Sequence, residues 1–120
     1  MDRQLTVKNF LNAEVKSLNN SHGGKGPFDL IEIWKKSDFK SNIDFFDRVV
    51  ISPNSSIGVH KHANNEEMYV VLAGRGKMTI NGKTITVKKG DMILNPPFGE
   101  HGLHNDSEED IDILIIQIGC

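Results

Sequence analysis

The chain has 120 residues, of which 38% are hydrophobic, so it is long enough to bury the core of one ordinary domain without covalent staples. Its 14 basic residues are balanced by 16 acidic ones, for a net charge of -2, and no basic block is present, which disfavours nucleic acid as a partner. Cys120, the single cysteine, excludes an intrachain disulfide and indicates a reducing compartment.

Apolar residues near the N-terminus recur at roughly helical spacing, which predicts a short helix or an irregular arm over residues 6–18. No apolar stretch in residues 1–20 is long enough for a signal-peptide core or a membrane span, so we expect a cytoplasmic protein with no membrane partner. A run of turn formers then predicts a loop over 19–27. We therefore divide the chain into an arm with its glycine-rich loop, residues 1–27, and one folded domain, residues 28–120. The apolar residues of the arm are Val7, Phe10, Leu11, Val15 and Leu18.

Short apolar runs separated by turn signals follow from residue 28 onward, which is typical of a mostly β protein. The clearest local signal is Asn81-Gly82, which lies between two alternating segments and has the residue types of a type I′ hairpin turn. Asn95-Pro96-Pro97 ends a strand, because neither proline can donate a backbone hydrogen bond. Many short strands with tight turns imply a sandwich or barrel. The apolar runs are 28–34, 43–52, 68–72, 77–80, 84–87, 92–94 and 111–118.

Two histidines separated by one residue, His60 and His62, follow the turn-like stretch 53–58. Residues two apart in a strand point to the same face, about 7 Å apart, so both imidazoles can converge on one metal ion. By itself such a pair is weak evidence of a metal site, because most pairs of this kind in soluble proteins are surface or core residues.

Further candidate ligands lie downstream. In the strand predicted over 66–72, alternation places Glu67 on the same face as Tyr69 and places Glu66 on the other face. We therefore predict Glu67 as a carboxylate ligand and expect Glu66 to face solvent. His101 follows a proline-glycine turn at the start of a later strand and is the fourth candidate.

The first of these segments resembles the first signature motif of the cupin superfamily. That motif has glycine, His-x-His, three or four residues, glutamate, six residues and glycine. The matching residues here are His60, His62, Glu67 and Gly74. The leading glycine of the motif is out of register, because Gly58 stands only two residues before His60.

The second segment resembles the second cupin motif, which has glycine, five residues, proline, one residue, glycine, two residues, histidine, three residues and asparagine. The matching residues are Gly90, Pro96, His101 and Asn105. Phe98 occupies the position of the motif's second glycine, and Gly99 follows one residue later. We expect this departure to change the turn in detail and to leave His101 in register.

The resemblance covers about residues 44–118 and implies an all-β fold, an antiparallel jelly-roll β-barrel with the N-terminal arm attached. It also implies one divalent transition metal ion inside the barrel, with one or two positions left for water or substrate. Three imidazoles and one carboxylate suit Fe, Mn, Ni, Co, Cu or Zn and suit Ca or Mg poorly. The implied metal ligands are His60, His62, Glu67 and His101.

A metal ion in this fold does not define a reaction, because the fold hosts oxygenases, isomerases, epimerases, decarboxylases and binding proteins. We interpret the chain as a small metalloenzyme acting on a small polar substrate inside the barrel, because an open-sided ion can polarise a substrate or bind dioxygen beside it. The alternative is a non-catalytic binding protein in which the metal holds a small effector or ties the barrel together. The segments 23–26, 56–67 and 101–105 also resemble the cupin domain of hydrazine synthetases, which implies metal-promoted nitrogen to nitrogen bond formation as a subordinate hypothesis.

Two residues are candidates for orienting a substrate. Tyr69 is interpreted either as a hydroxyl donor or as a core residue, and Arg48 either as a contact for an acidic substrate or as an outer-face charge. His104, three residues after His101, is expected to face the opposite side. His22, in the glycine-rich loop, could reach over the mouth of the barrel, but we expect it to be solvated. Finally, the apolar residues of the arm predict a homodimer.

Overall fold

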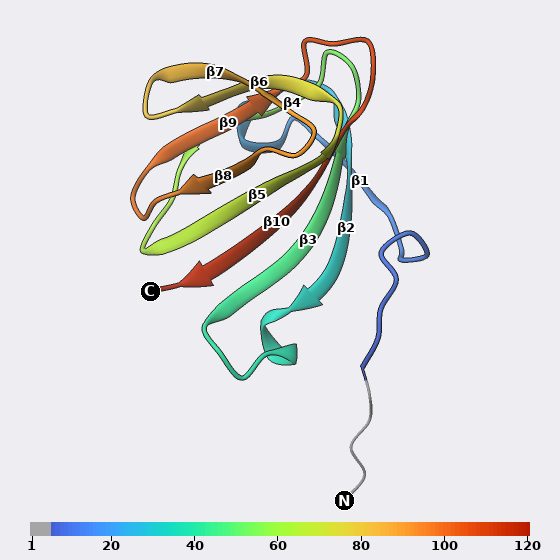
Figure 1. The fold of residues 1–120 in the computed structure, drawn as a ribbon, viewed down its shortest axis with the longest axis vertical. Helices are drawn as coiled ribbons and strands as arrows, with labels where there is room; N and C mark the ends of the chain where they lie inside the picture. The colour runs from blue at the N-terminus through green and yellow to red at the C-terminus, as the bar shows by residue number, and fades with distance from the viewer. Residues whose placement is uncertain (1–5) are drawn as a thin grey trace, which may run out of the picture.

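Two antiparallel sheets that face each other make up the structure of residues 6–120, the part of the chain that the computed structural model describes (Figure 1). The strands are β1 (Lys16–Asn19), β2 (Pro27–Lys35), β3 (Ile43–Ile51), β4 (Ser56–Lys61), β5 (Asn65–Ala73), β6 (Arg75–Ile80), β7 (Lys83–Lys88), β8 (Met92–Asn95), β9 (Glu100–His104) and β10 (Ile111–Gly119). Two short 3-10 segments, η1 (Ser21–Gly23) and η2 (Lys36–Asp38), lie between strands.

The order of the strands is that of a jelly roll. One sheet has six strands in the order β1-β2-β3-β10-β5-β8, and the other has four in the order β4-β9-β6-β7. Consecutive strands β4 and β5 belong to different sheets, and so do β8 and β9, so the chain crosses repeatedly between the layers. This confirms the predicted all-β, antiparallel jelly-roll fold. Within the described residues, no helix is long and apolar enough to cross a membrane.

The core lies between the inward faces of the two sheets. Along β5 the inward side chains of Glu67, Tyr69 and Val71 are buried, whereas Met68 and Val70 on the other face are only half-buried. Each large apolar side chain buried in this way stabilises the fold by about 1.5–3 kcal/mol. The alternation predicted for this strand is therefore confirmed, and it places a carboxylate among core residues.

The predicted two-residue hairpin is also confirmed. Asn81 and Gly82 join β6 to β7 with φ angles of 47° and 82°, the left-handed conformations that a type I′ turn needs.

The N-terminal arm takes the irregular of its two predicted forms and adds a strand that was not predicted. Residues 6–15 form an irregular segment with one turn, in which Asn12 N donates to Asn9 O at 3.1 Å, and Lys16–Asn19 pairs with β2 as strand β1. The helical alternative is wrong here because pairing with the free edge of β2 outweighs a weak helical pattern. Residues 1–5 of the predicted arm lie outside the described residues.

Strand β4 also begins earlier than expected. The stretch 53–58 was predicted as a turn, yet Ser56 and Ile57 already pair with β9 as part of β4. The glycine-rich loop, residues 20–26, becomes the connection between β1 and β2.

The fully buried Asn105 closes the loop before β10. Its Nδ2 donates to Ile51 O at 2.8 Å and to Glu109 O at 2.7 Å, and its Oδ1 accepts from Ser107 N at 2.9 Å. We predict that Asn105→Ala lowers the free energy of unfolding by about 2–4 kcal/mol, because it removes the partner of the buried Ile51 carbonyl oxygen and of two partly buried backbone groups. Urea unfolding checks this, with the exposed Asn64→Ala as the control, which should change the value by less than about 0.5 kcal/mol. An equal loss in both variants would contradict the prediction.

Candidate metal centre

Four donor side chains converge inside the barrel. His60 in β4 and His101 in β9 face each other across paired strands. Glu67 lies on the inward face of β5, and His62 directly follows the last residue of β4. One ligand atom from each of these residues lies within 4.8 Å of the other three. The structure thus brings together the four residues predicted as metal ligands, which we call the four-residue cluster.

The rings of His60 and His62 point their Nε2 atoms at each other across 3.0 Å. The other nitrogen of each ring contacts an oxygen: His60 Nδ1 lies 2.8 Å from the carbonyl oxygen of Gly58, and His62 Nδ1 lies 2.9 Å from the side-chain oxygen of Asn65. These oxygens only accept hydrogen bonds, so in neutral rings both Nδ1 atoms carry the proton. Two Nε2 lone pairs then face each other, an arrangement that a cation between them would stabilise.

The remaining two members of the cluster complete the donor set. Glu67 Oε1 lies 3.0 Å from His101 Nε2 and 3.2 Å from His62 Nε2, and both Glu67 and His101 are buried. Burial lowers the pKa of His60, which favours the neutral ring that binds metal. Three imidazole nitrogens and one carboxylate oxygen are a donor set for a divalent transition metal. The residues present therefore fit such an ion.

His22 lies against this cluster, which differs from the prediction that it is simply solvated. Although the residue is exposed, its ring stacks on His60, with centroids 3.8 Å apart and planes 13° apart. The loop reaches this position because Gly24 and Gly58 bring two backbones into contact, and a Cβ on either glycine would collide with backbone atoms of the other segment. Gly24 and Gly58 were the signal in the sequence for this contact, because two backbones that touch leave no room for a side chain.

A cavity of about 170 Å³ lies beside the cluster. His60 and Glu67 form part of its wall, and the other polar residues that line it are Ser21, His22, Asp47 and Tyr69. The rest of the wall is mostly apolar. These apolar residues are Leu18, Phe28, Leu30, Phe45, Val49, Ile57 and Ile115.

Asp47 is a residue of this cavity that our sequence reasoning missed as a site residue. Burial, followed by repulsion from Glu32 and Glu67, raises the pKa of Asp47 to about 7. The signal was present in the strand alternation, because Asp47 shares the face of Phe45 and Val49, both of which line the cavity. A carboxyl on an inward apolar face is unusual and needs a reason.

Tyr69 lies at the cavity as well. Its ring is 2% exposed and meets the His101 ring edge-on, with centroids 5.4 Å apart. Burial, with a further contribution from Glu67, raises the pKa of the Tyr69 hydroxyl well above its usual value, so the group stays protonated near neutral pH. Tyr69 thus fills core space and also contributes to the cavity wall.

Arg48, the other candidate for substrate orientation, lies away from the cavity. It occupies the opposite face of β3 from Asp47 and forms a two-pronged ion pair with Asp112, through Nε at 2.8 Å and Nη2 at 2.7 Å. Its guanidinium also lies over the ring of Phe10, 5.0 Å from the centroid. Arg48 is therefore an outer-face charge, and we do not propose it as a substrate contact.

His104 lies outside the four-residue cluster. It is half-buried and lines a different surface hollow together with Lys77 and Thr79, which agrees with the expectation that it faces away from His101.

Phe98 takes the backbone conformation of the glycine that it replaces in the motif. Its φ is 61°, in the left-handed region, and its N–H donates to Ala63 O at 2.9 Å. The next residue accepts from His62, since His62 N donates to Gly99 O at 2.9 Å. The turn before β9 is therefore tied to the segment that carries His62, and the expectation that His101 remains in register is confirmed by its place in the cluster.

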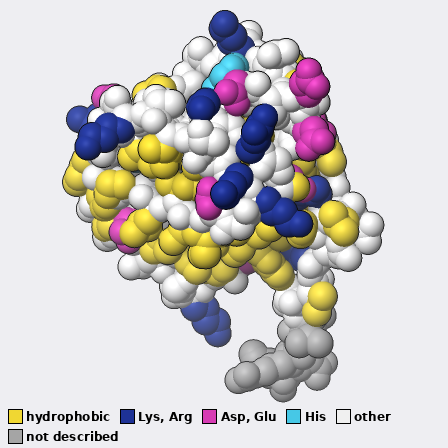
Figure 2. All heavy atoms as spheres, turned by 45° about the horizontal axis from the view of Figure 1, so that its top comes forward, with side chains coloured by type: hydrophobic (Ala, Val, Ile, Leu, Met, Phe, Trp, Pro, Cys, Tyr) yellow, Lys and Arg dark blue, Asp and Glu magenta, His cyan; other side chains and the backbone are white. Residues whose placement is uncertain are grey.

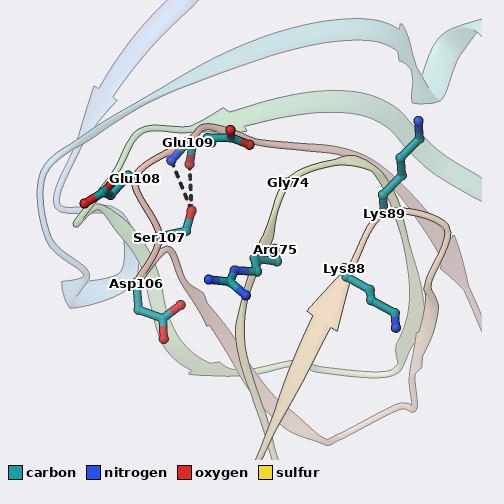
Figure 3. A pocket seen from close by; sticks show the side chains of 8 residues that line it. All are labelled: Gly74, Arg75, Lys88, Lys89, Asp106, Ser107, Glu108 and Glu109. Carbon is teal, nitrogen blue, oxygen red and sulfur yellow. Dashed lines mark hydrogen bonds between the residues drawn. The ribbon is translucent and has the colours of Figure 1, made fainter.

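A larger hollow of about 710 Å³ lies elsewhere on the surface, where basic side chains face acidic ones (Figure 3). None of its residues belongs to the four-residue cluster. Its charged side chains are exposed, so water screens them and their pairing contributes little. The residues that line it are Gly74, Arg75, Lys88, Lys89, Asp106, Ser107, Glu108 and Glu109.

Comparison with known proteins gives a consistent result. Residues 47–117 match the cupin domain family. The chain is 31% identical over 101 residues to an oxalate-binding protein of Thermotoga maritima, and the match covers 84% of each chain. It also resembles the crystal structure of a predicted oxalate decarboxylase from Thermotoga maritima, with a TM-score of 0.93, 28% identity, and coverage of 96% of this chain and 100% of the other.

More distant structures share the fold alone. The cupin domain of Schizosaccharomyces pombe Cnp3 superposes with a TM-score of 0.79 at 12% identity, covering 98% of this chain and 76% of that one.

We predict that the Asp47 carboxyl lowers the stability of the metal-free protein at neutral pH. Its folded pKa of about 7 lies above the unfolded value, so the folded state binds more protons, and the stability contribution falls as pH rises from 4 to 7. Asp47→Asn removes this dependence. After allowance for partial solvent screening, the variant should be more stable than wild type by about 1–2 kcal/mol at pH 7.5 and by less at pH 5.

Urea unfolding in the presence of a chelator at both pH values measures this difference. The exposed Asp29→Asn on β2 is the control and should show no such pH dependence. The prediction fails if the two asparagine variants give the same pH profile.

Proposed function

This chain belongs to the cupin domain family, and we propose that it holds one divalent transition metal ion on its four-residue cluster and binds a small carboxylate-bearing molecule beside that ion. The observation that carries this proposal is the pair of Nε2 atoms of His60 and His62, which face each other at 3.0 Å while both Nδ1 atoms contact acceptors. Hydrogen-bonded Nδ1 atoms also fix the ring orientation, as is common for metal-binding histidines.

The ion would supply Lewis-acid polarisation of an oxygen ligand at a position next to the cavity. The residues of the chain then have separate roles. His60, His62, Glu67 and His101 hold the ion, and the protonated Tyr69 hydroxyl and the His22 ring border the space for the ligand. The apolar remainder of the wall keeps this space poor in water, which strengthens polar interactions inside it.

Two matches from Thermotoga maritima, one in sequence and one in structure, have names that support a carboxylate as the ligand class. One is named for oxalate binding and the other as a predicted decarboxylase of oxalate. A carboxylate with a second oxygen on the neighbouring carbon can chelate a metal ion through both oxygens. A metal ion with open coordination positions can bind such a ligand.

Catalysis is the second candidate function, and Asp47 is the observation that favours it. A carboxyl with a pKa of about 7 can accept or donate a proton near neutral pH, and Asp47 lines the cavity next to Glu67 and His60. The reaction would then be of the oxygenase, isomerase or rearrangement type on a small polar substrate. Nitrogen to nitrogen bond formation remains the subordinate hypothesis, since the names of similar proteins favour a carboxylate ligand.

We predict that metal-free protein binds one equivalent of Co²⁺ and that His62→Ala weakens this binding by at least about 100-fold. Changing a residue that only supports a metal ligand already weakens metal binding, and removing one of the four ligands should weaken it more. Titration followed by the visible absorption of Co²⁺ measures the affinity. His104→Ala removes a histidine outside the cluster and is the matched control. No uptake by wild type, or equal loss in both variants, would refute the metal site.

Addition of oxalate to the cobalt-loaded protein tests the second half of the proposal. A change in the absorption spectrum that saturates at one ligand per chain supports binding beside the ion. An unchanged spectrum up to millimolar oxalate, repeated with other small carboxylates, would leave the metal as a structural ion.

We also propose a homodimer, formed through the outward face of the six-stranded sheet. An antiparallel sheet usually presents polar residues to water on its outer face, but here register aligns an apolar row across four strands. Two β8 residues are the most open, with Met92 66% and Leu94 57% exposed. Figure 2 shows hydrophobic side chains gathered in a broad band on one face of the molecule. The row consists of Leu94, Met68, Ile116 and Phe46.

We predict that wild type elutes as a dimer in gel filtration with light scattering at micromolar concentration, and that Leu94→Glu elutes as a monomer. A charge on this face would have to be desolvated at the interface, which costs several kcal/mol. Leu11→Glu, in the exposed arm, separates the two possible interfaces. A dimer that survives Leu94→Glu and is lost in Leu11→Glu would assign the interface to the arm, and a monomeric wild type would remove the proposal.

A further inference from the structure

The cavity beside the four-residue cluster has a wall that is poorly matched to oxalate. Oxalate is a small dianion, and a carboxylate that enters a mostly apolar space needs a cationic or hydrogen-bonding partner. Among the described residues, no lysine or arginine lines this cavity. Two basic residues on the neighbouring strands pair with carboxylates, since Lys16 contacts Glu32 and Arg48 contacts Asp112.

The charges that do face the cavity are acidic. Asp47 lines it and lies outside the four-residue cluster, whereas the charge of Glu67 would be shared with the ion, and Glu32 is close enough to repel Asp47. A second carboxylate directed away from the ion would therefore meet the Asp47 carboxyl and a mostly apolar wall, in which Ser21, His22 and Tyr69 supply the hydrogen-bonding side chains. Repulsion of this kind works against a dianion and against longer dicarboxylates.

Three apolar side chains of the wall retain surface that is exposed to solvent. Leu18, Leu30 and Phe45 are only partly buried, although they pack against the core, and all three line the cavity. Contact with an apolar group of a ligand would remove this surface from water, a gain of about 25 cal/mol for each Å². The wall thus favours a ligand with an apolar tail.

The volume limits the length of that tail. Since one water molecule occupies about 30 Å³ of the liquid, a cavity of about 170 Å³ has room for about six atoms of that size. The cavity opens to solvent, so a short aliphatic chain can lie wholly against its wall, whereas the end of a long chain would extend into water.

From the lining and size of this cavity, we propose that the molecule held beside the ion is a 2-oxo or 2-hydroxy monocarboxylic acid with a short aliphatic tail, and that oxalate is a weaker ligand. This inference rests on the proposed metal site and names its ligand class. The carboxylate and the neighbouring oxygen would face the ion, as those of oxalate would, and the tail would contact Leu18, Leu30 and Phe45.

Titration of cobalt-loaded wild type with a homologous series tests the proposal. The ligands are glyoxylate, pyruvate, 2-oxobutyrate, 2-oxopentanoate and 2-oxooctanoate, with oxalate and 2-oxoglutarate as dianions. Affinity should rise about fourfold for each added methylene up to the four- or five-carbon acid, and should rise no further for the eight-carbon acid. The best monoacid should bind at least tenfold more tightly than either dianion.

A variant that narrows the cavity gives an independent test. Leu30→Phe should reduce the affinity for 2-oxopentanoate at least tenfold and leave that for glyoxylate within twofold, because only the longer ligand reaches the enlarged side chain. Leu11→Phe makes the same substitution on the exposed arm and is the matched control, which should alter neither affinity.

The outcomes separate this inference from the proposed function. Oxalate binding as tight as or tighter than every monoacid overturns the inference and leaves the metal-binding function intact. A flat response to tail length in wild type also overturns it, and this result does not depend on how well any variant folds. Loss of cobalt binding by wild type refutes the proposed function itself.

Discussion

The opposition of two imidazole nitrogens inside the barrel is the constraint on which the rest of the site depends. The Nε2 atoms of His60 and His62 lie 3.0 Å from each other. This arrangement requires that the opposite side of each ring be fixed, and the Gly58 carbonyl oxygen and the Asn65 side chain do this by contacting the Nδ1 atoms of His60 and His62, respectively. The barrel supplies that restraint because paired strands fix which side chains face inward. A cluster of like donors this close is stable when an ion is shared among them, so the fold and the metal chemistry support each other.

Most of the fold and the donor set could be predicted from the sequence, because both depend on local patterns. The alternation in β5 identifies Glu67 over Glu66, and Asn81-Gly82 identifies its hairpin, without knowledge of the rest of the chain. The strand β1 could not be predicted in this way, since it forms against the edge of β2 and has little pattern of its own.

The residues around the ligand space were harder to predict because their positions depend on contacts between distant segments. His22 reaches the cluster only because Gly24 and Gly58 allow two backbones to touch. Asp47 was visible as an inward residue of its strand, but its proximity to Glu67 follows from the order of strands in the sheet, with β10 between β3 and β5. Sequence spacing predicts which face of a strand a side chain occupies. The order of the strands in the sheets determines which of these side chains lie close together.

The apolar row on the outer face of the six-stranded sheet has a consequence for how β10 finds its place between β3 and β5. Strand β10 has apolar residues on both of its faces. If it paired one residue out of register, its outward aliphatic side chains would turn into the core and its inward ones would turn out, and little hydrophobic burial would be lost. The correct alignment must therefore be selected by polar features. Asp112 is the one charged residue of β10, and its two-pronged pairing with Arg48 is available in the observed alignment, whereas a one-residue shift would turn the Asp112 carboxylate into the core. Arg48, first considered as a substrate contact, thus serves the barrel as the residue that fixes strand alignment.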